Sequence, residues 1–134
     1  MKQKEIKIIE NYQLKQHEEV GKNHLLRLLE QIKQDGFIDV PLVVDQNTGI
    51  ILDGHHRFNV IKQLGLGFSP CILVDYASSE IEVAAWQKGQ TVTKNTVIEA
   101  GLSGNLLKPR TSKHSIPNVP EGLKIPLSKL KPRP

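Results

Sequence analysis

The sequence has little cysteine and few aromatic residues, and each shortage excludes a class of protein. Its 134 residues include a single cysteine, Cys71, so an intramolecular disulfide, a cysteine-based zinc site and a CxxC redox motif are all excluded. Aromatic residues make up 4% of the chain, and none lies among the cations of the C-terminal segment. A stacking platform for single-stranded nucleic acid is therefore not expected.

Long apolar runs are also missing. No stretch approaches the roughly 20 apolar residues that a membrane-spanning helix needs, and the N-terminal residues lack the apolar block of a secretory signal. The composition, 38% hydrophobic and 24% charged, is typical of a globular protein, and the length favours one domain with a modest core. We therefore expect a cytoplasmic protein without a membrane partner.

The basic residues are unevenly distributed along a chain whose net charge is +4. Seven of the 18 Lys and Arg residues, and six of the eight prolines, lie between residues 105 and 134, where Glu121 is the one acidic residue. A basic segment of this kind can bind nucleic acid or small anions such as phosphates. For its last six residues, a solvated tail is the expected structure.

Apolar spacing predicts short helices and strands, which together indicate a small α+β domain. The interval i, i+3, i+4, i+7 between Leu25 and Ile32 predicts a helix over residues 22–34 that ends at Gly36. A second helix is predicted around residues 58–64, and a third over 93–102 with Thr93 as its N-cap. Strands are predicted at 6–9, 40–45, 50–52, 71–74 and 80–86, followed by ordered but irregular chain to about residue 130.

The densest chemistry is the string Asp53-Gly54-His55-His56-Arg57, between a predicted strand and a predicted helix. The first N–H groups of a helix have no partners within the helix, and its dipole favours negative charge there. Gly54 lets the backbone approach a ligand closely, Arg57 offers a planar fork for phosphate oxygens, and the two imidazoles add donors. The string predicts a site for an anion or a nucleotide, in which Asp53 can hold Mg²⁺ or a hydroxyl group.

Each of these residues also has a purely structural explanation. Asp53 can act as the N-cap of the helix. His55 and His56 together suggest a metal site, but adjacent side chains diverge and no His-x₃-His spacing follows, so zinc is not favoured.

Three further features are candidates for the same site. His17-Glu18-Glu19 is either a solvated loop or a loop that carries a general base. The run from Arg110 to His114 is either basic surface or a segment that captures a carboxylate or a phosphate. Trp86, the one tryptophan, suits either the core or the apolar wall of a small-molecule pocket.

These motifs resemble the ParB/sulfiredoxin superfamily and, within it, the free L-serine kinases. The resemblance rests on His17-Glu18, on residues 51–57, on Val74-Asp75-Tyr76, on Trp86 and on residues 110–114. It implies a mixed sheet flanked by short helices, with a Pro-rich basic C-terminal segment that wraps the body. Residues 1–107 would form the nucleotide-binding domain, and residues 108–134 would complete the substrate pocket.

The resemblance also implies an activity and roles for individual residues. Free serine kinases transfer a phosphoryl group from ATP or ADP, with Mg²⁺, to the hydroxyl of L-serine, giving O-phospho-L-serine. Glu18 matches the catalytic base, and Asp53 the acidic residue near the transferred phosphate and Mg²⁺. The phosphate-binding loop corresponds to Gly54, His55, His56 and Arg57, and the serine pocket to Trp86, Thr111 and His114.

Other functions within the superfamily remain open to different degrees. A ParB-like domain that binds CTP, ATP or DNA would carry a Gly-Glu-Arg-Arg box followed by a helix-turn-helix, whereas this chain has Asp-Gly-His-His-Arg and a Pro-rich tail, so nucleic acid is not the expected partner. Sulfiredoxin chemistry needs a cysteine where His55 stands. A nuclease, or a kinase for threonine or homoserine, stays possible, and neither the phosphate donor nor the oligomeric state is predicted.

Overall fold

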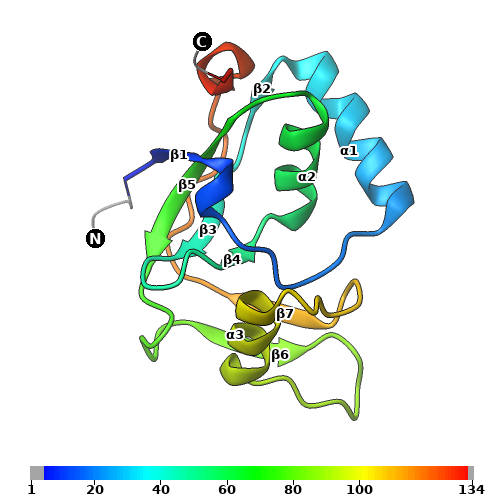
Figure 1. Ribbon diagram of the computed structural model, residues 1–134, viewed down its shortest axis with the longest axis vertical. Helices are drawn as coiled ribbons and strands as arrows, with labels where there is room; N and C mark the ends of the chain where they lie inside the picture. The colour runs from blue at the N-terminus through cyan, green and yellow to red at the C-terminus, as the bar shows by residue number, and fades with distance from the viewer. Residues whose placement is uncertain (1–4, 133–134) are drawn as a thin grey trace.

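The computed structural model describes residues 5–132 and consists of short elements that alternate along the chain (Figure 1). The helices are α1 (Lys22–Asp35), α2 (His55–Gln63) and α3 (Lys94–Ser103), with 3₁₀ turns η1 (Asn11–Gln13) and η2 (Leu127–Leu130). The strands are β1 (Lys7–Glu10), β2 (Phe37–Ile38), β3 (Leu42–Asp45), β4 (Ile51–Asp53), β5 (Phe68–Val74), β6 (Glu82–Ala85), β7 (Ser112–Ser115) and β8 (Ile125–Pro126). Every predicted helix and strand is present, whereas β2, β7 and β8 were not predicted.

The central sheet has the strand order β1-β5-β3-β4 and is mixed. Strands β3 and β5 run parallel, while the pairs β1–β5 and β3–β4 are antiparallel. Two small antiparallel pairs, β2–β8 and β6–β7, lie outside this sheet. Helices α1 and α2 lie side by side on one flank of the molecule, and α3 lies beside the β6–β7 pair (Figure 1). This arrangement confirms the predicted α+β class with a mixed sheet.

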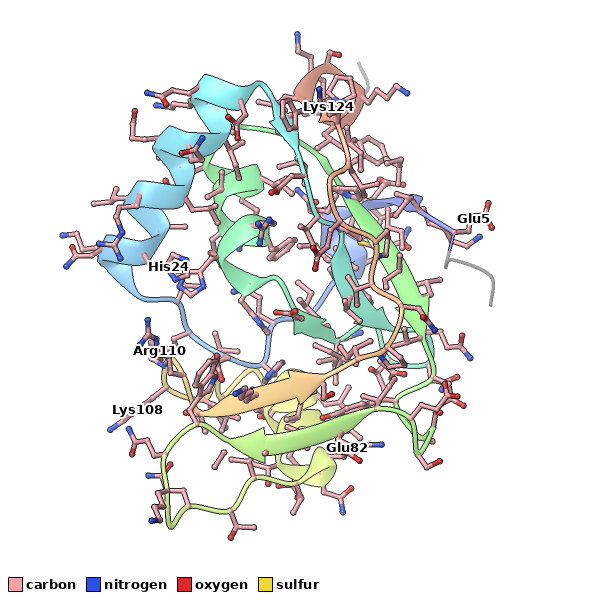
Figure 2. All side chains as sticks on the ribbon, turned by 180° about the vertical axis from the view of Figure 1, so that it is seen from behind. Glu5, His24, Glu82, Lys108, Arg110 and Lys124 are labelled. Carbon is pink, nitrogen blue, oxygen red and sulfur yellow. The ribbon has the colours of Figure 1, made fainter. Side chains whose placement is uncertain are left out.

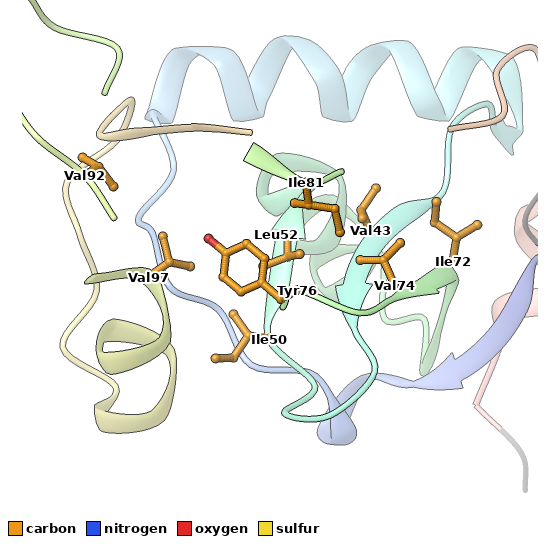
Figure 3. Close-up of a cluster of buried hydrophobic side chains, with 9 residues drawn as sticks. All are labelled: Val43, Ile50, Leu52, Ile72, Val74, Tyr76, Ile81, Val92 and Val97. Carbon is orange, nitrogen blue, oxygen red and sulfur yellow. The ribbon is translucent and has the colours of Figure 1, made fainter. Parts of the chain in front are cut away.

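Buried apolar side chains form the core on both sides of the sheet. One cluster lies between the sheet and α3 and includes Ile50, Ile72 and Val97 (Figure 3). Another joins α1 and α2 to the end of the chain through Ile32, Ile61 and other side chains. Within residues 5–132, no helix is both long and apolar enough to cross a membrane.

The predicted helix ends are present because the residues at these positions satisfy backbone groups locally. Gly36 follows α1 with φ 76° and donates its N–H to Ile32 O, which is the left-handed termination that glycine favours. Thr93 begins α3 as its N-cap, and its side-chain oxygen accepts the backbone N–H of Thr96. Both terminations were predicted from the sequence.

The C-terminal segment is part of the folded body. Strand β7 pairs with β6, β8 pairs with β2, and Gly67 donates a backbone hydrogen bond to Leu130 O. The prediction of a solvated tail over the last six residues is wrong for Leu130, which is fully buried, because apolar residues of α1 and α2 surround it. Residues 133 and 134 lie outside the described range.

We expect Leu130→Ala to lower the free energy of unfolding by about 2–5 kcal/mol, because it leaves a cavity between α1, α2 and β2. Leu102→Ala is the matched control, since that side chain is 59% exposed and its loss should cost little. Urea denaturation of the two variants measures the difference. Equal stability of the two variants would show that the C-terminal segment does not contribute to the core.

Candidate functional site

A pocket of about 570 Å³ opens where the start of α2, the loop before α1 and strand β7 meet. This volume suits a small-molecule ligand. The pocket is lined by Glu18, His24, Leu28, Leu52, Asp53, Gly54, His55, His56, Arg57, Trp86, Arg110, Ser112, Lys113 and His114. His24 on α1 and Arg110 before β7 lie on the same side of the molecule (Figure 2), so the pocket brings together segments that are far apart in the sequence.

Most of the site residues predicted from the sequence meet in this pocket. Those that line it are Glu18, Asp53, Gly54, His55, His56, Arg57, Trp86 and His114. Thr111 does not line it, and its hydroxyl donates to the carbonyl of Lys108 at 2.6 Å. From the predicted run of residues 110–114, Arg110, Ser112 and Lys113 also line the pocket, and the structure adds residues that were not selected, namely His24, Leu28 and Leu52.

The start of α2 has the geometry of an anion site. Gly54 is the N-cap residue, with φ 102°, and no side chain caps the helix, so Asp53 is not the N-cap. A Cβ atom on Gly54 would lie 2.6 Å from Leu42 Cδ2, so both the space and the backbone conformation require glycine here. The free N–H groups of the first turn therefore remain available to a ligand.

His55 and His56 hold the loop that carries Glu18. Nε2 of His55 accepts the backbone N–H of His17 at 3.1 Å, and Nε2 of His56 accepts that of Gly21 at 3.1 Å. These two ring nitrogens are thus acceptors, so each neutral ring carries its hydrogen on Nδ1, and donation from these rings to phosphate stays a prediction. The sequence concealed this role because the bonds join residues 38 and 35 positions apart.

Glu18 is held by one carboxylate oxygen only. Its Oε1 accepts the backbone N–H groups of Thr111 at 3.2 Å and Ser112 at 2.9 Å, and the hydroxyl of Ser112 at 2.9 Å. Among residues 5–132, no group donates to its Oε2. The carboxylate is therefore fixed in orientation, and Glu18 lines the pocket with one oxygen left without a donor among the described residues.

The buried side chain of His17 also fixes the loop that carries Glu18. Its side chain is buried, with Nδ1 2.7 Å from Ile51 O and Nε2 3.0 Å from Ser112 Oγ. Its ring meets the edge of the His55 ring at 4.4 Å between centroids. The loop is therefore fixed to strand β4, to α2 and to β7 at once.

Asp53 and Arg57 supply opposite charges to the pocket. Asp53 is open to the pocket but surrounded by protein, and this desolvation raises the pKa of its carboxyl group against the opposing effects of the Gly54 N–H and Arg57. Arg57 donates through Nε and Nη2 to Asp39 Oδ1, both at 3.3 Å. Asp39 therefore orients the guanidinium, a role that no local motif in the sequence indicates.

Burial keeps four imidazoles at and beneath the pocket, those of His17, His55, His56 and His114, neutral at pH 7. Desolvation lowers the pKa of His17 and of His56 to about 4 and that of His114 to about 3, and it lowers the pKa of His55 well below its usual range. His55 and His56 therefore bring no positive charge to the pocket. Arg57, Arg110 and Lys113 supply the positive charge of the pocket lining instead.

Part of the chain is similar in sequence to L-serine kinases and to a ParB-like protein. The chain is 36% identical to an ATP-dependent L-serine kinase of Desulfurococcus mucosus over 86 residues, which are 61% of this chain and 34% of that protein. It is 38% identical to a ParB-like protein of Sulfolobus acidocaldarius over 76 residues (57% and 38%), and 28% identical to the ADP-dependent L-serine kinase of Thermococcus kodakarensis over 95 residues (68% and 39%). No family model matches the chain. The chain spans between a third and two fifths of the length of these curated relatives.

The fold is that of a solved kinase structure. A free serine kinase in complex with AMP superposes with a TM-score of 0.88 over 97% of this chain and 95% of that chain, at 16% sequence identity. At this identity the likeness shows a shared fold. Together with the sequence similarities, it confirms the predicted resemblance to the serine kinase branch of the ParB/sulfiredoxin superfamily.

The neutral, buried His17 predicts a stability that falls as the pH falls. Its pKa is 6.5 when unfolded and about 4 when folded, so the unfolded state binds the proton first and gains stability below pH 6.5. At 1.36 kcal/mol per pKa unit, protonation of His17 alone should lower the free energy of unfolding by about 2 kcal/mol when the pH falls from 7.5 to 5.

Urea denaturation of the wild type and of His17→Asn across this pH range tests the prediction. Asparagine can still donate to Ile51 O but does not titrate, so the variant should lose less stability toward pH 5 than the wild type. Parallel pH dependences in the two proteins would contradict the assignment.

Proposed function

We propose that this chain transfers the terminal phosphoryl group of ATP or ADP to the hydroxyl of free L-serine, giving O-phospho-L-serine. The observation that carries the proposal is the orientation of Glu18, fixed through Oε1 with Oε2 free in a pocket that also contains Asp53 and the uncapped start of α2. The kinase names of two relatives support the same activity.

The donor side of the pocket suits nucleotide phosphates. The free N–H groups of the first turn of α2, which follow Gly54, can donate hydrogen bonds to phosphate oxygens. Arg57 adds a guanidinium, and Arg110 adds a second from the C-terminal segment. In this proposal residues 1–107 form the nucleotide-binding domain, and the segment 108–134 adds Arg110 and completes the pocket.

Asp53 is the residue that would hold Mg²⁺. Magnesium in nucleotide sites is commonly bound by one or two carboxylates together with substrate phosphates and waters. Within residues 5–132 there is no group of three or more His, Cys, Asp or Glu side chains able to hold a metal. The single carboxylate of Asp53 suits a cation that nucleotide phosphates also ligate, where it would neutralise phosphate charge.

The acceptor side is formed by Trp86, Lys113 and His114. Trp86 is 52% exposed and forms an apolar wall, with Lys113 Nζ 4.9 Å from the centre of its ring. Nε2 of His114 lies 2.8 Å from the hydroxyl of Tyr76, which fixes the ring. An amino acid that carries both a carboxylate and a hydroxyl fits this mixture of cation and apolar wall, while Thr111 contributes through its backbone N–H to Glu18.

The protein contributes to this reaction mainly by positioning the reactants and neutralising charge. Phosphoryl transfer depends mainly on the placement of the nucleophile and on neutralisation of the phosphate oxygens. Oε2 of Glu18 accepts the proton of the hydroxyl of free serine, and the hydroxyl oxygen of that serine attacks the terminal phosphorus of the nucleotide. A positioned base of this type contributes about 10²–10⁴-fold in rate.

Incubation of the protein with Mg²⁺, ATP or ADP, and a panel of free amino acids, followed by phosphorus NMR, tests the activity. A new phosphomonoester signal with serine, and none with threonine or homoserine, is the expected result. A ParB-like nucleotide-binding module is the second candidate, on the strength of the ParB-like relative. Nucleotide hydrolysis without any acceptor preference would favour that candidate and contradict the kinase.

Glu18→Gln should fold and bind nucleotide but lose turnover by about 10²-fold or more, because an amide cannot accept the hydroxyl proton. Its control is Glu19→Gln, the same change at the adjacent exposed position. Rates come from the phosphorus NMR assay and affinities from calorimetric titration with nucleotide. Near-normal turnover in Glu18→Gln would remove the base assignment.

Arg57→Ala should weaken nucleotide binding by about 10-fold or more, since hydrogen bonds to charged groups contribute about 1.5–3 kcal/mol each. Arg27→Ala, on the exposed face of α1, is the matched control for the loss of one positive charge. Calorimetric titration with ADP compares the two variants. Equal affinities would place the phosphates away from the start of α2.

A further inference from the structure

Ser112 lies between two acceptors and has one proton to donate. Its side chain is buried, and its Oγ is 2.9 Å from Glu18 Oε1 and 3.0 Å from His17 Nε2. A serine hydroxyl carries a single O–H together with two lone pairs. At any moment, therefore, the Ser112 hydroxyl can donate its hydrogen to only one of the two, Glu18 Oε1 or His17 Nε2.

The proton positions on His17 follow from its other partner. Nδ1 lies 2.7 Å from the carbonyl oxygen of Ile51, which can only accept, so Nδ1 carries a hydrogen. The neutral imidazole then has a lone pair at Nε2, facing Ser112. Burial supports the neutral form, since it lowers the pKa of His17 to about 4.

The donors to Glu18 are of two kinds. The backbone N–H groups of Thr111 and Ser112 are fixed, and they point at Oε1 whether the carboxylate is charged or neutral. The hydroxyl of Ser112 can rotate about its Cβ–Oγ bond and has a second acceptor in reach. An ionised carboxylate is a stronger acceptor than a neutral carboxyl group, so the charge of Glu18 decides the direction of the hydroxyl.

We propose that Ser112 is a positioning residue for Glu18, whose hydroxyl donates to Glu18 Oε1 while the carboxylate is ionised and turns to His17 Nε2 when Glu18 takes up a proton. The inference rests on the proposed function, because it concerns the residue assigned as the base. The backbone donors hold the carboxylate in place in both states, and the rotating hydroxyl pairs with His17 once the charge of Glu18 is gone.

The reaction step balances with this movement. The O–H bond of the acceptor breaks and its proton bonds to Glu18 Oε2, while the acceptor oxygen bonds to the terminal phosphorus. The bond between that phosphorus and the bridging oxygen breaks, and the nucleotide leaves with the electron pair. The Ser112 proton turns to His17 without leaving its oxygen, and the proton on Glu18 passes to water after product release.

Other titratable groups surround His17 but do not replace Ser112. The rings of His55 on α2 and His114 on β7 face it at 4.4 and 5.6 Å between centroids, and Asp53 on β4 acts on it through its charge. Nε2 of His55 accepts the His17 backbone N–H, and Nε2 of His114 is bonded to Tyr76. Within the described residues, Ser112 is the one side chain hydrogen-bonded to both His17 and Glu18.

Kinetics of Ser112→Ala and Ser112→Thr test the proposal. The alanine variant keeps the backbone donor but loses the hydroxyl, so kcat should fall about 10- to 100-fold with KM for serine and nucleotide little changed. The threonine variant restores a hydroxyl in a strand that suits a β-branched residue, and it should recover most of the turnover. Ser115→Ala, on the exposed part of the same strand, is the control.

A second measurement needs no activity. In nitrogen-15 NMR, the His17 Nε2 resonance should differ between the wild type and Glu18→Gln at pH 7, because the neutral amide leaves the Ser112 proton to His17. The difference should vanish when both proteins also carry Ser112→Ala. A His17 with its proton on Nε2, or a Ser112→Ala variant with wild-type kcat, would overturn the proposal. Absence of phosphoserine formation by the wild type would contradict the proposed function alone, since the resonance still reports the hydroxyl.

Discussion

The hydrogen bonds to Glu18 Oε1 are the interaction on which the pocket depends. They join a loop near the start of the chain to the beginning of β7, across 94 positions in the case of Ser112. Together with the pairing of β7 with β6, they hold the beginning of β7 beside the loop that carries Glu18. The same bonds orient the carboxylate, so one contact both completes the pocket wall and aims the proposed base.

Burial changes the roles of the histidines around this contact. Imidazoles that would be cations near a phosphate in water become neutral when protein surrounds them, and their ring nitrogens then accept backbone N–H groups. The loop that carries Glu18 is therefore held by uncharged rings. The positive charge of the pocket comes from side chains at its rim, Arg110 and Lys113, and from Arg57, which Asp39 orients.

Local patterns predicted the parts of the fold that local physics controls. The apolar period of α1, its termination at Gly36 and the N-cap at Thr93 depend on residues within one or two turns, and the structure has all three. Strands β2 and β8 have two residues each, too short for any period to appear, and they exist because they pair with one another. Likewise, β7 is polar and becomes a strand only by pairing with β6.

For the candidate site, the sequence by itself predicted most of the residues that line the pocket. The helix start after Asp53 was predicted from residue types and neighbours, because anion binding at a helix N-terminus is a local property. Glu18 was chosen within its loop by the resemblance to the free serine kinases. The tertiary structure alone decided how these residues are used. It made Ser112 the partner of Glu18, gave Asp39 to Arg57 and made acceptors of two imidazoles, because such contacts join distant positions and depend on desolvation.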